Sequence, residues 1–82
     1  MELTIKLAIP KEMMTRQAAD IAHKMSEFVS RVLLKRQNLT VNAKSLMGVL
    51  SADLRDGQAI TIQAEGPDEA QAVCTLSRML GA

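Results

Sequence analysis

The stretch Ala43-Lys44-Ser45-Leu46-Met47-Gly48-Val49-Leu50 joins two patterns that decide how this chain folds. The alternation typical of a strand ends at Ala43, and a short apolar run with helical spacing begins after Ser45. Ser45 therefore stands at a predicted helix N-cap, where its oxygen accepts a hydrogen bond from a free backbone N–H. The same hydroxyl is a candidate phosphate acceptor, because a helix N-terminus tolerates added negative charge. From this stretch alone the cap is the simpler interpretation, and both stay open.

The composition indicates one small folded domain over residues 1–82. The chain is 48% hydrophobic and carries ten basic and nine acidic residues, for a net charge of +1. This balance gives no electrostatic case for direct nucleic-acid binding, and Phe28 is the only aromatic side chain available for base stacking. No apolar run approaches membrane-spanning length, so no membrane partner is expected. A single cysteine, Cys74, and the lack of a signal-peptide pattern predict a cytoplasmic protein.

Four runs of alternating apolar and polar residues are predicted to be strands with one buried face. Pro10 ends the first run, since it has no N–H to donate. Gln37-Asn38 is a candidate two-residue turn between the second and third, and Asp56-Gly57 a turn before the fourth. The four runs cover residues 3–9, 31–36, 39–43 and 60–64.

Three helices are predicted between and after these strands. The first follows Thr15 as its N-cap, and the last opens at 66–69, where Pro67 and two acidic residues suit a helix start, and stops at Gly81. In the short helix after Ser45, Met47 lies at the edge of the apolar side and is expected to be exposed. The apolar positions are Ala18, Ala19, Ile21, Ala22, Met25 and Phe28 in the first helix, Leu46, Val49 and Leu50 in the second, and Val73, Leu76, Met79 and Leu80 in the third.

The order of elements is therefore β-α-β-β-α-β-α. Each strand has one apolar face and each helix one apolar stripe. This combination predicts an α+β fold with two layers, in which helices cover one face of a four-stranded antiparallel sheet.

Few residues offer catalytic or metal-binding chemistry. With one histidine and one cysteine, metal-cluster spacings are absent, and we expect neither metal nor cofactor. His23 is expected on the polar face of the first helix, as a solvated residue, and Cys74 is expected to be a small packing residue. The pair Met13-Met14 is expected either to cover the core locally or to form an adhesive surface. Arg16 opposes the helix dipole, so it is either a solvated charge or an anion contact.

The whole chain resembles HPr, the small phosphocarrier family of the bacterial sugar phosphotransferase system. The matching motifs are Thr15-Arg16-x-Ala18-Ala19, the run 41–48, Asp56-Gly57 and Ala64-Glu65-Gly66-x-Asp68-Glu69. The resemblance implies an open-faced β-sandwich. The run 41–48 resembles the regulatory-serine motif of the forms found in Gram-positive bacteria, which implies phosphorylation of Ser45 by HPr kinase/phosphorylase and docking to a LacI-type catabolite regulator.

The chain departs from the family at the phosphocarrier motif Gly-Leu-His-x-Arg-Pro-Ala. Here the window 12–18 places Met14 at the histidine position and Gln17 at the proline position. A thioether cannot replace the imidazole nitrogen that accepts the phosphoryl group. The chain thus resembles in logic the catabolite-repression HPr (Crh) type, which lacks the active histidine, although it has Met14 where that type has glutamine and lacks that type's Gly-Leu and Arg-Pro pairings.

The resemblance therefore implies a non-catalytic regulatory protein. Arg16 would contact the phosphate or the partner, and Leu46, Met47 and Leu50 would form the apolar part of a docking surface. Other phosphotransferase-system proteins remain candidate partners, as does a second copy of the chain. The alternatives are a constitutive interaction module and a diverged phosphocarrier paralogue.

Overall fold

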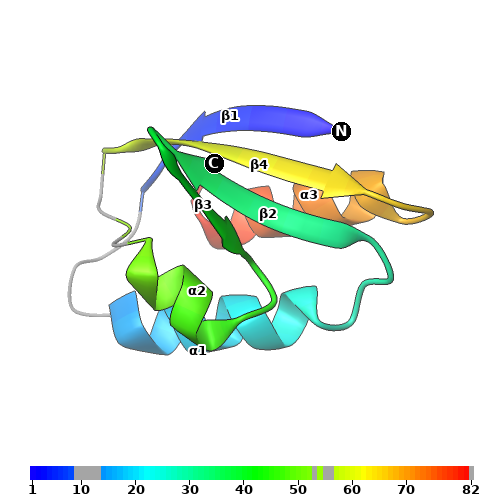
Figure 1. The fold of residues 1–82 in the computed structure, drawn as a ribbon, viewed down its shortest axis with the longest axis horizontal. Coiled ribbons are helices and arrows are strands. Elements are labelled where there is room, and N and C mark those ends of the chain that lie inside the picture. Colours follow the sequence, from blue (N-terminus) through cyan, green and yellow to red (C-terminus); the bar gives the residue numbers. More distant parts are fainter. Residues whose placement is uncertain (9–13, 53, 55–56, 82) are drawn as a thin grey trace.

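The computed structural model describes residues 1–8, 14–52, 54 and 57–81, apart from the side chains of Met14 and Thr15. The strands and helices of this part of the chain follow one another in the predicted order (Figure 1). They are β1 (Glu2–Lys6), α1 (Met14–Met25), β2 (Arg31–Arg36), β3 (Leu39–Asn42), α2 (Leu46–Ser51), β4 (Ala59–Glu65) and α3 (Glu69–Met79).

The four strands form one antiparallel sheet in the order β1-β4-β2-β3. β4, the last strand in the chain, therefore lies between the first and the second. Apolar residues stand opposite one another across these pairs, with Ile5 facing Ile60 and Leu34 facing Ile62. Since opposite residues of antiparallel strands share a face, the register collects the apolar side chains on one side of the sheet.

All three helices lie on that apolar side, and the other face of the sheet is open (Figure 1). On the open face the hydroxyls of Thr4 and Thr61, which are cross-strand partners, are 2.9 Å apart. The predicted two-layer α+β fold is therefore confirmed. The core contains Ile5, Leu7, Ala18, Ile21, Met25, Val32, Leu34, Ala43, Val49, Ala52, Leu54, Ile60, Ile62, Ala64, Ala72, Val73, Leu76 and Leu80.

The first helix differs from its prediction in several details. α1 begins at Met14, so Thr15 lies inside its first turn and is not the N-cap. Ala19 is exposed, because it points about 100° around the helix from buried Ala18. Phe28 follows the end of the helix and packs, partly buried, against the core. Gln17 is half-buried and donates a 2.5 Å hydrogen bond to the carbonyl of Met79, which links α1 to α3.

Several other predictions concern strand ends and turns. Leu3, expected on a buried face, is 40% exposed because β1 is an edge strand. Gln37 adopts a positive φ of 52° in the turn between β2 and β3, as expected for a tight hairpin. The predicted strand end at Ile9 and Pro10, the Met13 contact and Asp56 of the second turn lie outside the described residues.

Candidate functional site

Ser45 is the N-cap of α2, as the sequence predicts. Its backbone is extended, with φ −105° and ψ 123°, and its Oγ accepts a 3.1 Å hydrogen bond from the N–H of Gly48. Its carbonyl accepts the first bond of the helix from Val49, at 2.9 Å. The Ser45 side chain is only half-buried, so its oxygen satisfies the helix end beside solvent.

The corner before Ser45 is held by Asn42. The side-chain oxygen of Asn42 accepts a bond from the N–H of Lys44 at 2.9 Å, and its carbonyl accepts one from Ser45 at 3.1 Å. Gly48 fits closely against this corner, since a Cβ there would lie 3.0 Å from the Asn42 carbonyl oxygen. The small residue three positions after the cap therefore lets α2 pack onto the end of β3.

Lys44 is anchored and does not extend freely into solvent. Its Nζ donates a 2.7 Å hydrogen bond to the carbonyl of Phe28, just after the end of α1. The side chain is half-buried, and the contact satisfies a carbonyl near a helix C-terminus. The positive charge of Lys44 is therefore held against the end of α1. Sequence alone gives no signal for this contact, because it depends on how the β3–α2 corner packs onto α1.

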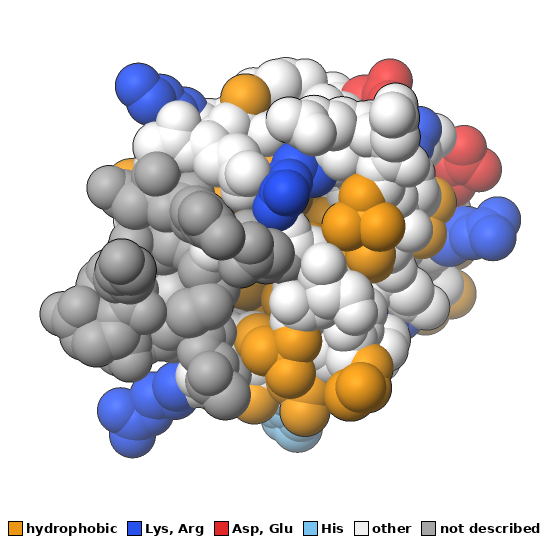
Figure 2. Space-filling model, turned by 60° about the vertical axis from the view of Figure 1, so that its left-hand side comes forward, with side chains coloured by type: hydrophobic (Ala, Val, Ile, Leu, Met, Phe, Trp, Pro, Cys, Tyr) orange, Lys and Arg blue, Asp and Glu red, His pale blue; other side chains and the backbone are white. Residues whose placement is uncertain are grey.

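An apolar surface extends from Ser45 along α2. Leu46, Met47 and Leu50 are 42%, 73% and 39% exposed, and only Val49 of this helix is a buried apolar residue. The exposure of Met47 confirms its prediction. The sequence pattern places Leu46 and Leu50 on the same side of the helix as Val49. They nevertheless remain exposed, because this six-residue helix contributes one residue, Val49, to the core. Figure 2 shows hydrophobic side chains gathered at the surface on the side of the molecule where α2 lies.

Met14 and Arg16 both lie in the first turn of α1. The side chain of Met14 is outside the described part. Arg16 is exposed and has no hydrogen bond or salt bridge with another described residue, so its charge is available to a partner. α1 and α2 pack against each other, but within the described residues no hydrogen bond joins Arg16 to Ser45.

The remaining reactive side chains of the described part of the chain are those of His23 and Cys74. His23 is exposed on α1, as predicted. Cys74, expected to pack in the core, is instead exposed, and the Nη2 of Arg78 donates to its Sγ over 3.6 Å. The spacing of four residues in a helix is a signal that could have revealed this neighbour. Among the described residues, no cluster of three or more His, Cys, Asp and Glu could bind a metal. None of the helices in the described ranges has the length and apolar content to cross a bilayer.

An open-faced sandwich with a serine-capped second helix and an adjoining exposed apolar surface defines a small protein of the phosphocarrier class. Residues 1–82 match the family model PTS-HPr, described as "PTS HPr component phosphorylation site". The chain therefore belongs to the HPr family of the phosphotransferase system, as the sequence resemblance indicates.

Individual relatives agree with this family. The phosphocarrier protein HPr of Treponema pallidum (strain Nichols) is 39% identical over 64 residues, which cover 78% of this chain and 73% of that protein. A crystal structure of HPr from Bacillus anthracis str. Ames superposes with a TM-score of 0.92 at 28% identity, over 98% of this chain and 95% of that chain.

The second type of relative is Crh. The crystal structure of Crh from Bacillus subtilis, described as a catabolite repression protein and a swapped, intertwined dimer, gives a TM-score of 0.76 at 32% identity. The match covers 93% of this chain and 83% of Crh. The chain is thus similar to both phosphocarrier and Crh members of its family.

Proposed function

We propose that this chain is a non-catalytic, regulatory HPr-like protein, which is phosphorylated on Ser45 and then docks to a LacI-type transcriptional regulator. The observation that carries the proposal is the position of the Ser45 hydroxyl. It is half-buried at a helix end and adjoins the exposed side chains of Leu46 and Met47. A partner that covers this apolar surface would be in direct reach of a group attached to Ser45.

Phosphorylation would change the electrostatics of this surface more than its shape. A phosphoserine carries nearly two negative charges at neutral pH. Lys44 is already bonded to a carbonyl, and Arg16 is exposed with no acidic partner among the described residues. The added charge would therefore be recognised mainly by cations of the partner, with Arg16 as a second contact.

Relay of phosphate through a histidine is not part of this proposal. The family position of the active histidine holds Met14, whose thioether cannot carry a transferable phosphoryl group. Incubation with enzyme I and phosphoenolpyruvate is expected to leave the protein unmodified. A stoichiometric phosphohistidine would contradict this part of the proposal.

Serine phosphorylation is tested with HPr kinase/phosphorylase and ATP, followed by mass spectrometry. We expect one added phosphate on the native chain and none on Ser45→Ala. Ser51→Ala is the matched control, because Ser51 is an exposed hydroxyl at the other end of the same helix. Absence of a mass increase, or an increase that survives Ser45→Ala, would refute the assignment.

A constitutive interaction module is the second candidate, and the exposure of Leu46, Met47 and Leu50 in the unmodified chain favours it. Affinity capture with the LacI-type regulator or with phosphotransferase-system proteins separates the two functions. Capture that requires the phosphate supports regulation, whereas equal capture without it supports the constitutive module. A homodimer is a further candidate state, by analogy with the Crh crystal structure, and sedimentation of the pure chain tests it.

A further inference from the structure

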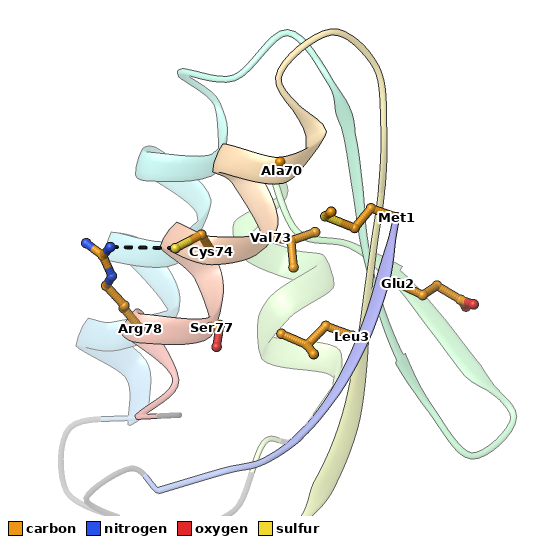
Figure 3. A pocket seen from close by; sticks show the side chains of 8 residues that line it. All are labelled: Met1, Glu2, Leu3, Ala70, Val73, Cys74, Ser77 and Arg78. Atoms are coloured by element: carbon orange, nitrogen blue, oxygen red, sulfur yellow. Dashed lines mark hydrogen bonds between the residues drawn. The ribbon is translucent and has the colours of Figure 1, made fainter.

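A groove between β1 and α3 lies apart from the Ser45 surface. Its volume is about 500 Å³, within the range of small-molecule sites. Ala70, Val73, Cys74 and Ser77 contribute one face of α3, since they are spaced by three and four residues. Figure 3 shows Leu3 and Met1 of the β1 side directed toward α3, with Val73 opposite them. Leu3 and Met1 are 40% and 53% exposed, so this apolar lining is open to a ligand.

The charges around the groove leave one unmatched cation. The ammonium group of Met1 lies 2.7 Å from the carboxylate of Glu69, whose pKa it lowers by its hydrogen bond and charge. The carboxylate of Glu2 lies 3.7 Å from Lys35, and Figure 3 shows Glu2 directed away from the groove. Arg78 has no acidic partner among the described residues.

The partner that Arg78 does have is weak. Its Nη2 contacts the Sγ of Cys74 at 3.6 Å, and a thiol sulfur is a poor acceptor. A guanidinium group is suited to a carboxylate, which accepts two parallel hydrogen bonds from it. Figure 3 shows the Arg78 guanidinium beyond Cys74, on the side away from Leu3, so it lies at the edge of the apolar lining. An apolar lining with this arginine at its edge is complementary to a molecule with an aliphatic part and one carboxylate.

We propose that the β1–α3 groove binds a small aliphatic carboxylate. The aliphatic chain lies on the exposed side chains of Met1 and Leu3, and the carboxylate accepts hydrogen bonds from the guanidinium of Arg78, beyond the exposed side chain of Cys74. This site is separate from the Ser45 surface, because the groove contains no residue of α2.

The test uses sodium octanoate as the probe, with amide chemical shifts of the whole chain as the readout. Saturable shifts confined to β1 and α3 are expected, with a dissociation constant on the order of 1 mM for so small a ligand. 1-Octanol should bind roughly tenfold more weakly, because it lacks the charge-assisted hydrogen bonds. Octylammonium, of equal length and opposite charge, should bind most weakly.

Two variants of Arg78 distinguish a loss of binding caused by the missing charge from one caused by unfolding. Arg78→Gln should reduce octanoate binding to the level of octanol, and Arg78→Lys should retain part of the difference. Both variants replace an exposed side chain, and a melting curve checks that each variant remains folded. Alkylation of Cys74 by iodoacetamide gives a readout on the unaltered protein, since it is the only cysteine, and octanoate should slow it.

Three results would overturn the proposal of a carboxylate site, and a fourth would overturn the role of Arg78 in it. Shifts that do not saturate, equal binding of octanoate and octylammonium, or shifts centred on Leu46, Met47 and Leu50 would each show that the groove is no carboxylate site. Unchanged octanoate affinity in Arg78→Gln would remove the assigned role of the guanidinium.

Discussion

Ser30 and Asp68, which are 38 residues apart in the sequence, each donate hydrogen bonds to the other. One carboxylate oxygen of Asp68 accepts from both the backbone N–H of Ser30, at 2.9 Å, and the Ser30 hydroxyl. The Ser30 oxygen in turn accepts from the N–H of Asp68, at 3.2 Å, and the second carboxylate oxygen accepts from Val29 at 2.9 Å. Asp68 occupies the N-cap position of α3 but makes no side-chain bond to that helix. Its carboxylate instead joins the entry of β2 to the entry of α3.

Stability should therefore depend on the charge of Asp68 in acid. The hydrogen bonds from Ser30 and Val29 hold the pKa of this carboxyl below its usual 3.8. Because the pKa is lowered in the folded state, the stabilisation is fully present above pH 3.8 and is lost as pH falls through the lowered value. Asp68→Asn should lower the melting temperature at pH 7. It should also remove the part of the acid-induced loss of stability that occurs below pH 3.8, as pH falls through the lowered pKa.

Asp20→Asn is the control for this substitution, since Asp20 is exposed on α1. Melting curves of the native chain and the two variants at neutral and acidic pH give the comparison. The same acid-induced loss of stability in Asp68→Asn as in the native chain would show that another carboxyl causes it.

Gly66 should resist substitution because it lies against the same serine. Its φ is 146°, and a Cβ there would lie 2.6 Å from the Oγ and 2.7 Å from the Cα of Ser30. Gly66→Ala is expected to lower the free energy of unfolding by about 3 kcal/mol, from backbone strain and the clash together. Gly57→Ala is the matched control, since Gly57 also has a positive φ, of 82°, but a Cβ there would have no atom of a described residue within 4 Å. Equal losses in urea denaturation would show that the contact with Ser30 is without effect.

The hydrogen bond at the Ser45 cap should stabilise the protein even when Ser45 carries no phosphate. Ser45→Ala removes the acceptor of the Gly48 N–H and should cost about 1 kcal/mol of unfolding free energy. Ser45→Asp restores an acceptor at the N-cap and should recover most of that loss. Chemical denaturation of both variants checks this, with Ser51→Ala as a control expected to stay near the native value. A fully stable Ser45→Ala would mean that solvent replaces the cap without loss.

Docking through α2 should depend on Met47. This side chain is 73% exposed, so Met47→Ser should leave the melting temperature nearly unchanged. Binding of the phosphorylated protein to its regulator, measured by calorimetry, should weaken by about tenfold or more if Met47 is buried at the centre of the interface. Val29→Ser is the control for loss of an exposed apolar side chain, because Val29 is 77% exposed and lies in the loop between α1 and β2, outside α2. Equal losses in the two variants would argue against a specific α2 surface.

Features of local spacing could be predicted from the sequence, and contacts between distant segments could not. The cap at Ser45, the exposed Met47 and the four strands follow from patterns within a few residues. The bonds between Asp68 and Ser30, and between Lys44 and Phe28, depend on which loops the fold brings together. Cys74 was misassigned because it lies just beside the buried stripe of α3, where one helical position separates the core from solvent.

The position of β4 in the sheet constrains when this protein can fold during its synthesis. β1 and β2 are not neighbours in the sheet, and each is joined to it through β4, which ends at Glu65. Before that strand leaves the ribosome, β2 and β3 can form only an isolated hairpin, which is marginally stable in water. A nascent chain stalled ahead of β4 would therefore present its apolar strands to chaperones, and the native sheet would assemble largely after translation.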